Sequence, residues 1–187
     1  MFLDLSAGIL LAIFANFYFG IKLTWYLIII TMVFAISPDI DFIWNFLKRR
    51  IINQSHREIL HHPLFFVFFG AVILFFFSKD FAFLFILAVF WHFLNDTMFM
   101  GLGVQWFWPF SKKYFNLFGI LWYQTPGKPK LPFKFFYIWT PEQIKEIEKK
   151  YGDPDWIRNI YFKPNFFAVI EYLIFIASII LLILYVK

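Results

Sequence analysis

The chain has 187 residues, of which 61% are hydrophobic and 26% aromatic, and its formal net charge is +5. A soluble globular domain is nearer half apolar, and the excess here lies in long uninterrupted stretches, so the composition excludes an ordinary soluble fold. The chain contains no cysteine, which excludes disulfides and thiolate metal ligands.

Several apolar stretches predict helices that cross a bilayer. They are expected at about 3–20, 23–44, 63–78, 81–100 and 166–186. Backbone polar groups must be satisfied within lipid, and these stretches lack the alternation of barrel strands, so we expect helices. The first stretch has no basic n-region or cleavage site and is expected to be a retained span. The sequence therefore predicts an all-α integral membrane protein, a single membrane domain over residues 1–187 with about five transmembrane helices in a bundle.

The segment at 101–165 is expected to lie outside the bilayer core. Residues 106–139 mix aromatics with Pro, Gly and Lys, a composition typical of the headgroup layer, and predict an interfacial aromatic segment. Thr140 and Gln143 form a capping box, with Pro141 at the first helical position. A short cytoplasmic helix is therefore expected at 142–151, ending before Gly152.

Basic residues indicate the orientation. If the short basic loop that contains Arg57 is cytoplasmic, alternation places the N-terminus and residues 101–165 on that same side. Every Lys and Arg except Lys22, Lys79 and Lys187 is then cytoplasmic, as the positive-inside rule requires. We expect an inner-membrane protein whose N-terminus faces the cytoplasm. Because the basic residues follow topology and form no separate domain, the expected partner is membrane lipid and not nucleic acid.

Ionisable side chains border the apolar stretches at the predicted cytoplasmic face, and a helix bundle would bring them together. Mixed imidazole and carboxylate ligands suit zinc, manganese or iron. The candidate metal ligands are Asp4, Asp39, Asp41, His56, His61, His92 and Asp96. A tetrahedral zinc needs about four ligands, so this set favours two divalent ions, an arrangement that activates water and stabilises phosphoryl transfer. Glu171 is expected instead to reach the membrane interface.

The spacings suit metal binding, but each also has a plainer interpretation. His92 and Asp96 are four residues apart and share one helix face, yet they would also make a buried hydrogen-bonded pair. Asp39 and Asp41 follow a helix that ends at a proline, where both can point to one place. As simple helix caps, these two aspartates would lie at a C-terminal helix end, where acids are unfavourable, because acids favour helix N-termini. Asp4 would also fit a solvated membrane edge.

These motifs resemble those of a known family, the YdjM-like membrane-bound metal-dependent hydrolases. Residues 37–41 (SPDID) resemble the family's LPDIDH signature, and residues 56–62 (HREILHH) resemble its HRGxTHS motif. Residues 92–97 (HFLNDT) are similar to HxxxDxxT, and residues 103–110 (GVQWFWPF) to the GVxLLWPF run that follows it. The resemblance covers about residues 1–110, with the motifs in the same order.

The chain departs from the family pattern at several positions. Phe42 replaces the histidine that follows the second aspartate, and His62 replaces a serine. Glu58 and Leu60 stand where the family has Gly and Thr. Asp4 occupies the place of a histidine that the family often has near its N-terminus, and aspartate also binds metal. None of these departures therefore removes a predicted metal ligand.

The resemblance implies a metal-dependent hydrolase, and we expect a phosphoesterase acting on a lipid or another membrane-proximal phosphoester. Metal coordination would bring the pKa of a water towards neutrality and make it the nucleophile. Asp41 is expected to accept its proton, and Glu58 is a possible second acid or base. Arg57 would clamp a phosphate, because its planar fork matches phosphate oxygens. His62 is a further candidate for substrate binding.

Two other functions stay open. Intramembrane His and Asp also mark ion paths, which would suit a metal transporter, although a path should carry ligands through the membrane depth. A structural or regulatory membrane protein with a metal site is the other alternative. Substitution of the metal ligands would then lower the stability of the protein and would not abolish an enzymatic activity.

Overall fold

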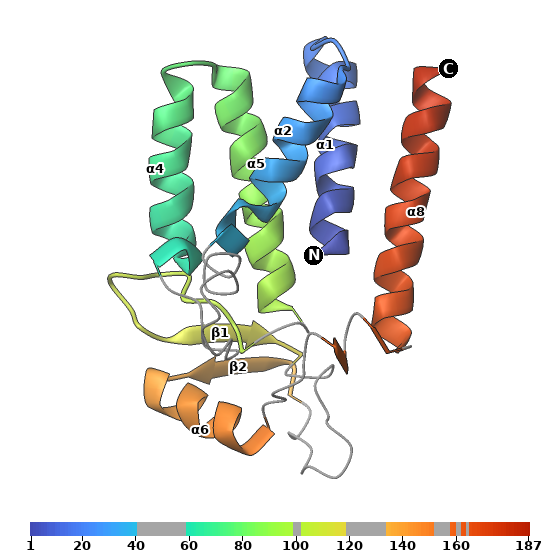
Figure 1. Cartoon of the computed structure of the whole chain (residues 1–187). Helices are drawn as coiled ribbons and strands as arrows, with labels where there is room; N and C mark the ends of the chain where they lie inside the picture. The colour runs from blue at the N-terminus through green and yellow to red at the C-terminus, as the bar shows by residue number, and fades with distance from the viewer. Residues whose placement is uncertain (41–58, 99–101, 119–133, 152–157, 160–161, 164) are drawn as a thin grey trace. The chain divides into compact units, whose positions relative to one another are not determined.

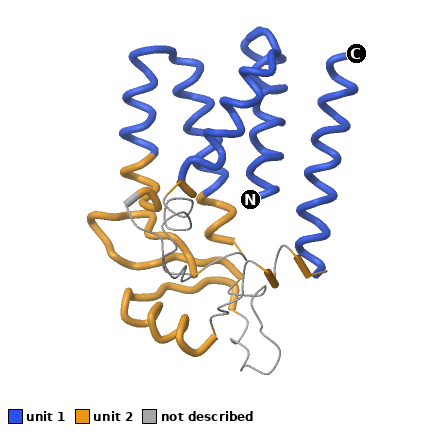
Figure 2. The backbone as a smooth tube through the Cα atoms, in the orientation of Figure 1, with its two compact units in different colours: residues 1–38, 67–92, 165–187 blue, residues 39–66, 93–164 orange. Residues whose placement is uncertain are grey.

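The computed structural model describes the chain except residues 41–58, 99–101, 119–133, 152–157, 160–161 and 164 (Figure 1). Its contacts divide the chain into two compact units, drawn in different colours in Figure 2. Unit 1 holds residues 1–38, 67–92 and 165–187, and unit 2 holds residues 39–66 and 93–164. The boundary passes through one continuous helix, α5 (Lys79–Thr97), between His92 and Phe93.

Unit 1 is built from apolar helices. Helix α1 (Phe2–Phe19) packs against α2 (Trp25–Ile36) and α8 (Phe166–Val186). Most of α4 (Pro63–Phe75) and the first part of α5 also belong to this unit. Gly8 lets α1 and α2 approach closely, because a Cβ there would lie 2.5 Å from the backbone Cα of Met32. Gly8 thus allows the close separation of α1 and α2 at this contact.

Helix α8 is held on α1 towards both of its ends. Near its start, the rings of Tyr172 and Phe175 meet the ring of Phe2 edge-on, with centroids 4.9 and 5.5 Å apart. Near its end, the Tyr185 hydroxyl donates to the Asn16 side-chain oxygen over 2.9 Å. These contacts join the last helix of the chain to the first, although they are separated by most of the sequence.

Large apolar side chains on the helices of unit 1 remain exposed. Phe17 is 78% exposed, Ile29 49% and Leu184 63%. Such surfaces are unfavourable in water and are expected where lipid is the solvent. By length and composition, three helices among the described residues suffice to cross a membrane, namely α1, α5 and α8. The membrane location is therefore supported.

The predicted count of about five spans is not confirmed. The two further apolar segments, Trp25–Asp39 and Pro63–Phe75, are shorter than the other three helices. Helix α2 has 12 residues, which gives about 18 Å of rise against a hydrocarbon core of about 30 Å. Its regular hydrogen bonding ends where residues Ser37–Asp39 turn into a short 3-10 helix, η1, at Pro38, because proline lacks an N–H donor.

Unit 2 contains a two-stranded antiparallel sheet that the all-α prediction missed. Strand β1 (Tyr114–Leu117) pairs with β2 (Phe136–Trp139), and Tyr114 lies opposite Trp139. Both strands lie within residues 106–139, the segment for which the sequence predicts only an interfacial, aromatic character. Their residues YFNL and FYIW are almost all apolar, so the polar alternation that signals a strand is absent.

The predicted charged helix is confirmed as α6 (Pro141–Tyr151). Its capping box is also present. The Thr140 backbone N–H donates to Gln143 Oε1 over 2.9 Å, and the Gln143 N–H donates to Thr140 Oγ1 over 3.4 Å. Ile144 is buried and α6 contacts β2, so this helix covers part of the sheet in unit 2 (Figure 1).

Candidate metal centre

Three chain segments supply the polar side chains of the candidate site, and each does so where a helix begins or ends. Asp39 closes η1 after α2. His61 closes η2 (Ile59–His61), just before α4 begins at Pro63, a residue suited to the first position of a helix. His92 and Asp96 lie one turn apart in α5. Helix ends therefore place these groups, as the sequence predicts.

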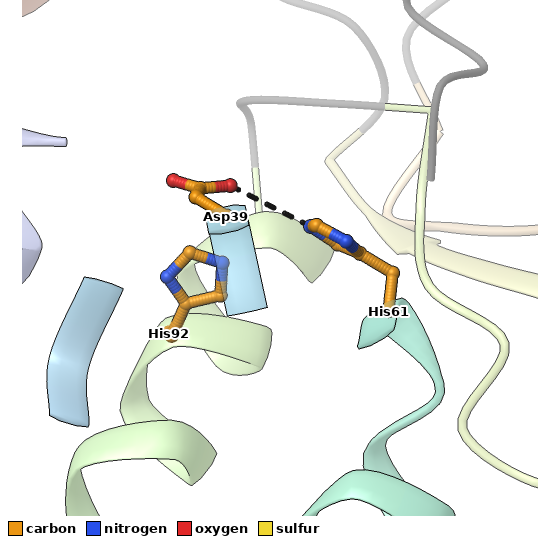
Figure 3. Close-up of side chains that lie close together, drawn as sticks. All are labelled: Asp39, His61 and His92. Carbon is orange, nitrogen blue, oxygen red and sulfur yellow. Dashed lines mark ion pairs between the residues drawn. The ribbon is translucent and has the colours of Figure 1, made fainter. Parts of the chain in front are cut away.

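Asp39, His61 and His92 form a group with the spacing of metal ligands. Each offers one ligand atom, and these atoms lie within 4.8 Å of one another. Figure 3 shows the carboxylate of Asp39 and the two imidazole rings converging from separate segments. The two histidines are 3% and 2% exposed. Two imidazoles and a carboxylate are a donor set that fits zinc or another divalent transition metal.

Within unit 2, His61 is the meeting point of two carboxylates. Its Nε2 lies 3.6 Å from Asp39 Oδ1 and 3.6 Å from Asp96 Oδ2. The Asp39 side chain is 30% exposed and that of Asp96 14%, whereas the imidazole is buried. Solvent therefore reaches this group from the side of its carboxylates.

Within unit 1, a third carboxylate faces His92. Asp4 Oδ1 lies 3.6 Å from His92 Nδ1, and both side chains are 2% exposed. The two ring nitrogens of His92 lie on different edges of the ring, one of them on the side of His61 (Figure 3). Histidines that bind metal commonly hold a carboxylate at their other nitrogen, which fixes the ring orientation. The contact through Nδ1 gives Asp4 this supporting position beside His92.

Glu171 is a polar residue whose place the sequence did not reveal. It was expected to reach the interface, but it is only 3% exposed. Its carboxylate and that of Asp4 both lie near the Met1 amino group, at 3.7 and 3.2 Å. One signal did point to it, because it is the only charged residue in the apolar sequence of α8, and such residues are costly in a membrane helix.

His62, adjacent to His61 in sequence, has a different environment. Its ring stacks on Trp108, with centroids 4.4 Å apart and an interplanar angle of 9°. Burial lowers the pKa of His62 below its usual value, and the charge that His61 can carry lowers it further. His62 is not in the group of Asp39, His61 and His92. His61 and His62 are thus adjacent in sequence but lie in two different environments.

Four further site predictions lie outside the described residues. They are the metal ligand His56, the residue Asp41 that was assigned both metal and catalytic roles, and the candidates Arg57 and Glu58. For the other predicted ligands, the structure brings Asp39, His61 and His92 into one group, with Asp96 beside His61 and Asp4 beside His92.

The sequence model of the YdjM inner membrane protein family matches residues 4–185. The chain belongs to this family. The match reaches well past the motifs in the first 110 residues and includes the sheet, α6 and most of α8. It also supports a membrane location for this YdjM family member. Comparison with curated proteins and with solved structures finds no match.

We expect His61→Ala and His92→Ala to lose bound metal, because each removes one imidazole from the group. Zinc affinity, measured by equilibrium dialysis of detergent-purified protein, should fall by more than the roughly 10–100-fold that loss of an outer-shell partner costs. His62→Ala is the matched control and should keep its zinc. Equal affinity in all three variants would contradict this assignment.

Asp4→Asn tests the supporting position of Asp4. The change keeps the side chain's size but removes the charge that faces His92 Nδ1. Zinc affinity should fall about 10–100-fold, which is less than in His92→Ala. A loss as large as that of His92→Ala would make Asp4 a direct ligand, and no loss would remove Asp4 from the site.

Proposed function

We propose that this YdjM family member is a metal-dependent hydrolase that cleaves a phosphoester at the membrane surface. The observation that carries the proposal is the group of Asp39, His61 and His92, whose ligand atoms lie within 4.8 Å of one another. Among the described residues the group supplies three protein ligands, the number typical of catalytic zinc sites, which keep a position open for water or substrate.

The residues around this group have separate tasks in the proposed reaction. Asp39, His61 and His92 would hold the ion. A divalent ion, when bound, lowers the pKa of a coordinated water and neutralises charge on phosphoryl oxygens. Asp96, whose Oδ2 lies 3.6 Å from His61 Nε2, would accept a proton. Asp4 would keep the His92 ring in its orientation from the opposite edge.

A phosphoester of a lipid, or one close to the membrane, is the proposed substrate class. Asp39 and His61 lie beside the ends of apolar helices and His92 lies within α5. The Asp39 side chain is the most exposed of the group at 30%. A substrate in the headgroup layer would therefore meet the site from its carboxylate side. Arg57 retains its proposed role as a phosphate clamp, with Asp41 and Glu58 as acid–base candidates and His62 as a substrate contact. The positive-inside rule supports a cytoplasmic site.

The proposal predicts metal-dependent release of phosphate. Purified protein supplied with zinc or manganese would be assayed against soluble aryl phosphates and against anionic phospholipids in mixed micelles. Removing metal with a chelator should abolish turnover, and returning metal should restore it. Asp96→Asn should lower kcat about 100-fold or more with bound metal retained, because loss of a general base typically costs 10²–10⁴-fold.

Glu146→Gln is a suitable control, because Glu146 is exposed on α6 and its charge plays no part in the proposed site. It should keep both metal and turnover. If the wild-type protein held metal and yet cleaved none of these phosphoesters, the enzymatic proposal would fail and a structural metal site would take its place. Accumulation of metal inside sealed proteoliposomes would instead indicate transport.

A further inference from the structure

The sheet of unit 2 has two different faces. Residues that lie directly opposite one another in an antiparallel pair share a face, so the register Phe115 with Ile138 and Leu117 with Phe136 defines one of them. Phe136 and Ile138 are 46% and 48% exposed. We call these four residues, together with Phe107, the open face.

Aromatic contacts make the open face continuous. The ring of Phe107 meets Phe115 edge-on with centroids 5.4 Å apart, and Phe115 lies 6.0 Å from Phe136. Phe107 is itself 56% exposed. Large apolar groups exposed side by side mark a surface that contacts a partner or a membrane.

The other face of the same sheet is buried. Asn116, Tyr137 and Trp139 are 0%, 8% and 7% exposed. Helix α6 contacts β2 and buries Ile144. If the strands were merely rich in apolar residues, the side chains on their two faces would be exposed to the same extent. The sheet therefore packs on its own unit mainly with this side. On the open face Phe115 and Leu117 are half-buried, and Phe136 and Ile138 remain exposed for another contact.

Charge is also distributed unequally around the sheet. Residues 97–141, which contain both strands and Phe107, carry five lysines and not one Asp or Glu. Lys112, Lys113 and Lys134 flank the strands and are exposed. The acidic residues of this region begin with Glu142 in α6. Among the described residues, the open face is thus edged mainly by positive charge, with Glu142 at the start of α6 near Lys112.

We propose that the open face is seated in the headgroup layer of an anionic membrane, with Phe107, Phe136 and Ile138 reaching the acyl boundary. Aromatic and aliphatic side chains at this depth, edged by lysines, are the pattern of an interfacial contact. Each lysine near an anionic surface adds to the attraction. Two copies joined through this face would bring their lysines together, and a surface with more lysines than acids favours a negatively charged partner.

The absence of cysteine allows a direct test, because one introduced cysteine is the only site for a thiol-specific nitroxide label. Ile138→Cys places the label on the open face, and Glu146→Cys places it on exposed α6. The full chain would be reconstituted in vesicles that contain phosphatidylglycerol. Label relaxation would then be measured with oxygen, which concentrates in the acyl region, and with a water-soluble nickel chelate.

The ratio of oxygen to nickel accessibility should be several-fold higher at position 138 than at position 146. Phe107→Cys provides a second reporter on the open face and should agree with position 138. Equal ratios at positions 138 and 146 would place the open face in water and overturn the proposal. Shielding of position 138 from both reagents would show that protein covers it. The test requires no catalytic turnover, so it stands apart from the proposed hydrolysis.

Discussion

Burial of the ionisable groups at the ends of apolar helices is the constraint on which the site depends. Asp4, His61 and His92 are each at most 3% exposed, and transfer of a charge from water to such surroundings costs several kcal/mol unless it is compensated. Carboxylates 3.6 Å from each imidazole supply part of that compensation. A divalent ion among Asp39, His61 and His92 would supply more. It would bind neutral imidazoles and neutralise carboxylate charge in one step.

The packing of unit 1 explains how Asp4 comes to serve this purpose. Gly8 brings α1 against the backbone of α2 at Met32, and Phe2 packs on Tyr172 and Phe175 of α8. The first turn of α1 is therefore held from two sides, and Asp4 lies within it. A carboxylate fixed in this way can hold an imidazole with little loss of conformational entropy. The glycine and the aromatic contacts thus act on the site without touching it.

The sequence predicted those parts of the fold that depend on local patterns. The capping box at Thr140 and the four-residue spacing of His92 and Asp96 each follow from a few neighbouring residues, and the helices formed as expected. The two strands were missed because apolar residues occupy both of their faces. The burial of Glu171 was missed because it arises from the packing of α8 on α1, residues far apart in sequence. The Nδ1 contact of Asp4 to His92 is of the same long-range kind.

The central claim is that two imidazoles share one ion, and X-ray absorption at the zinc edge tests it most directly. Protein loaded with one equivalent of zinc should show nitrogen and oxygen ligands at about 2.0–2.1 Å and outer-shell scattering from two imidazole rings. The His61→Ala protein, studied at concentrations high enough to offset its weaker zinc affinity, should show only one. A zinc environment without imidazole scattering, or one that is unchanged in His61→Ala, would contradict the account.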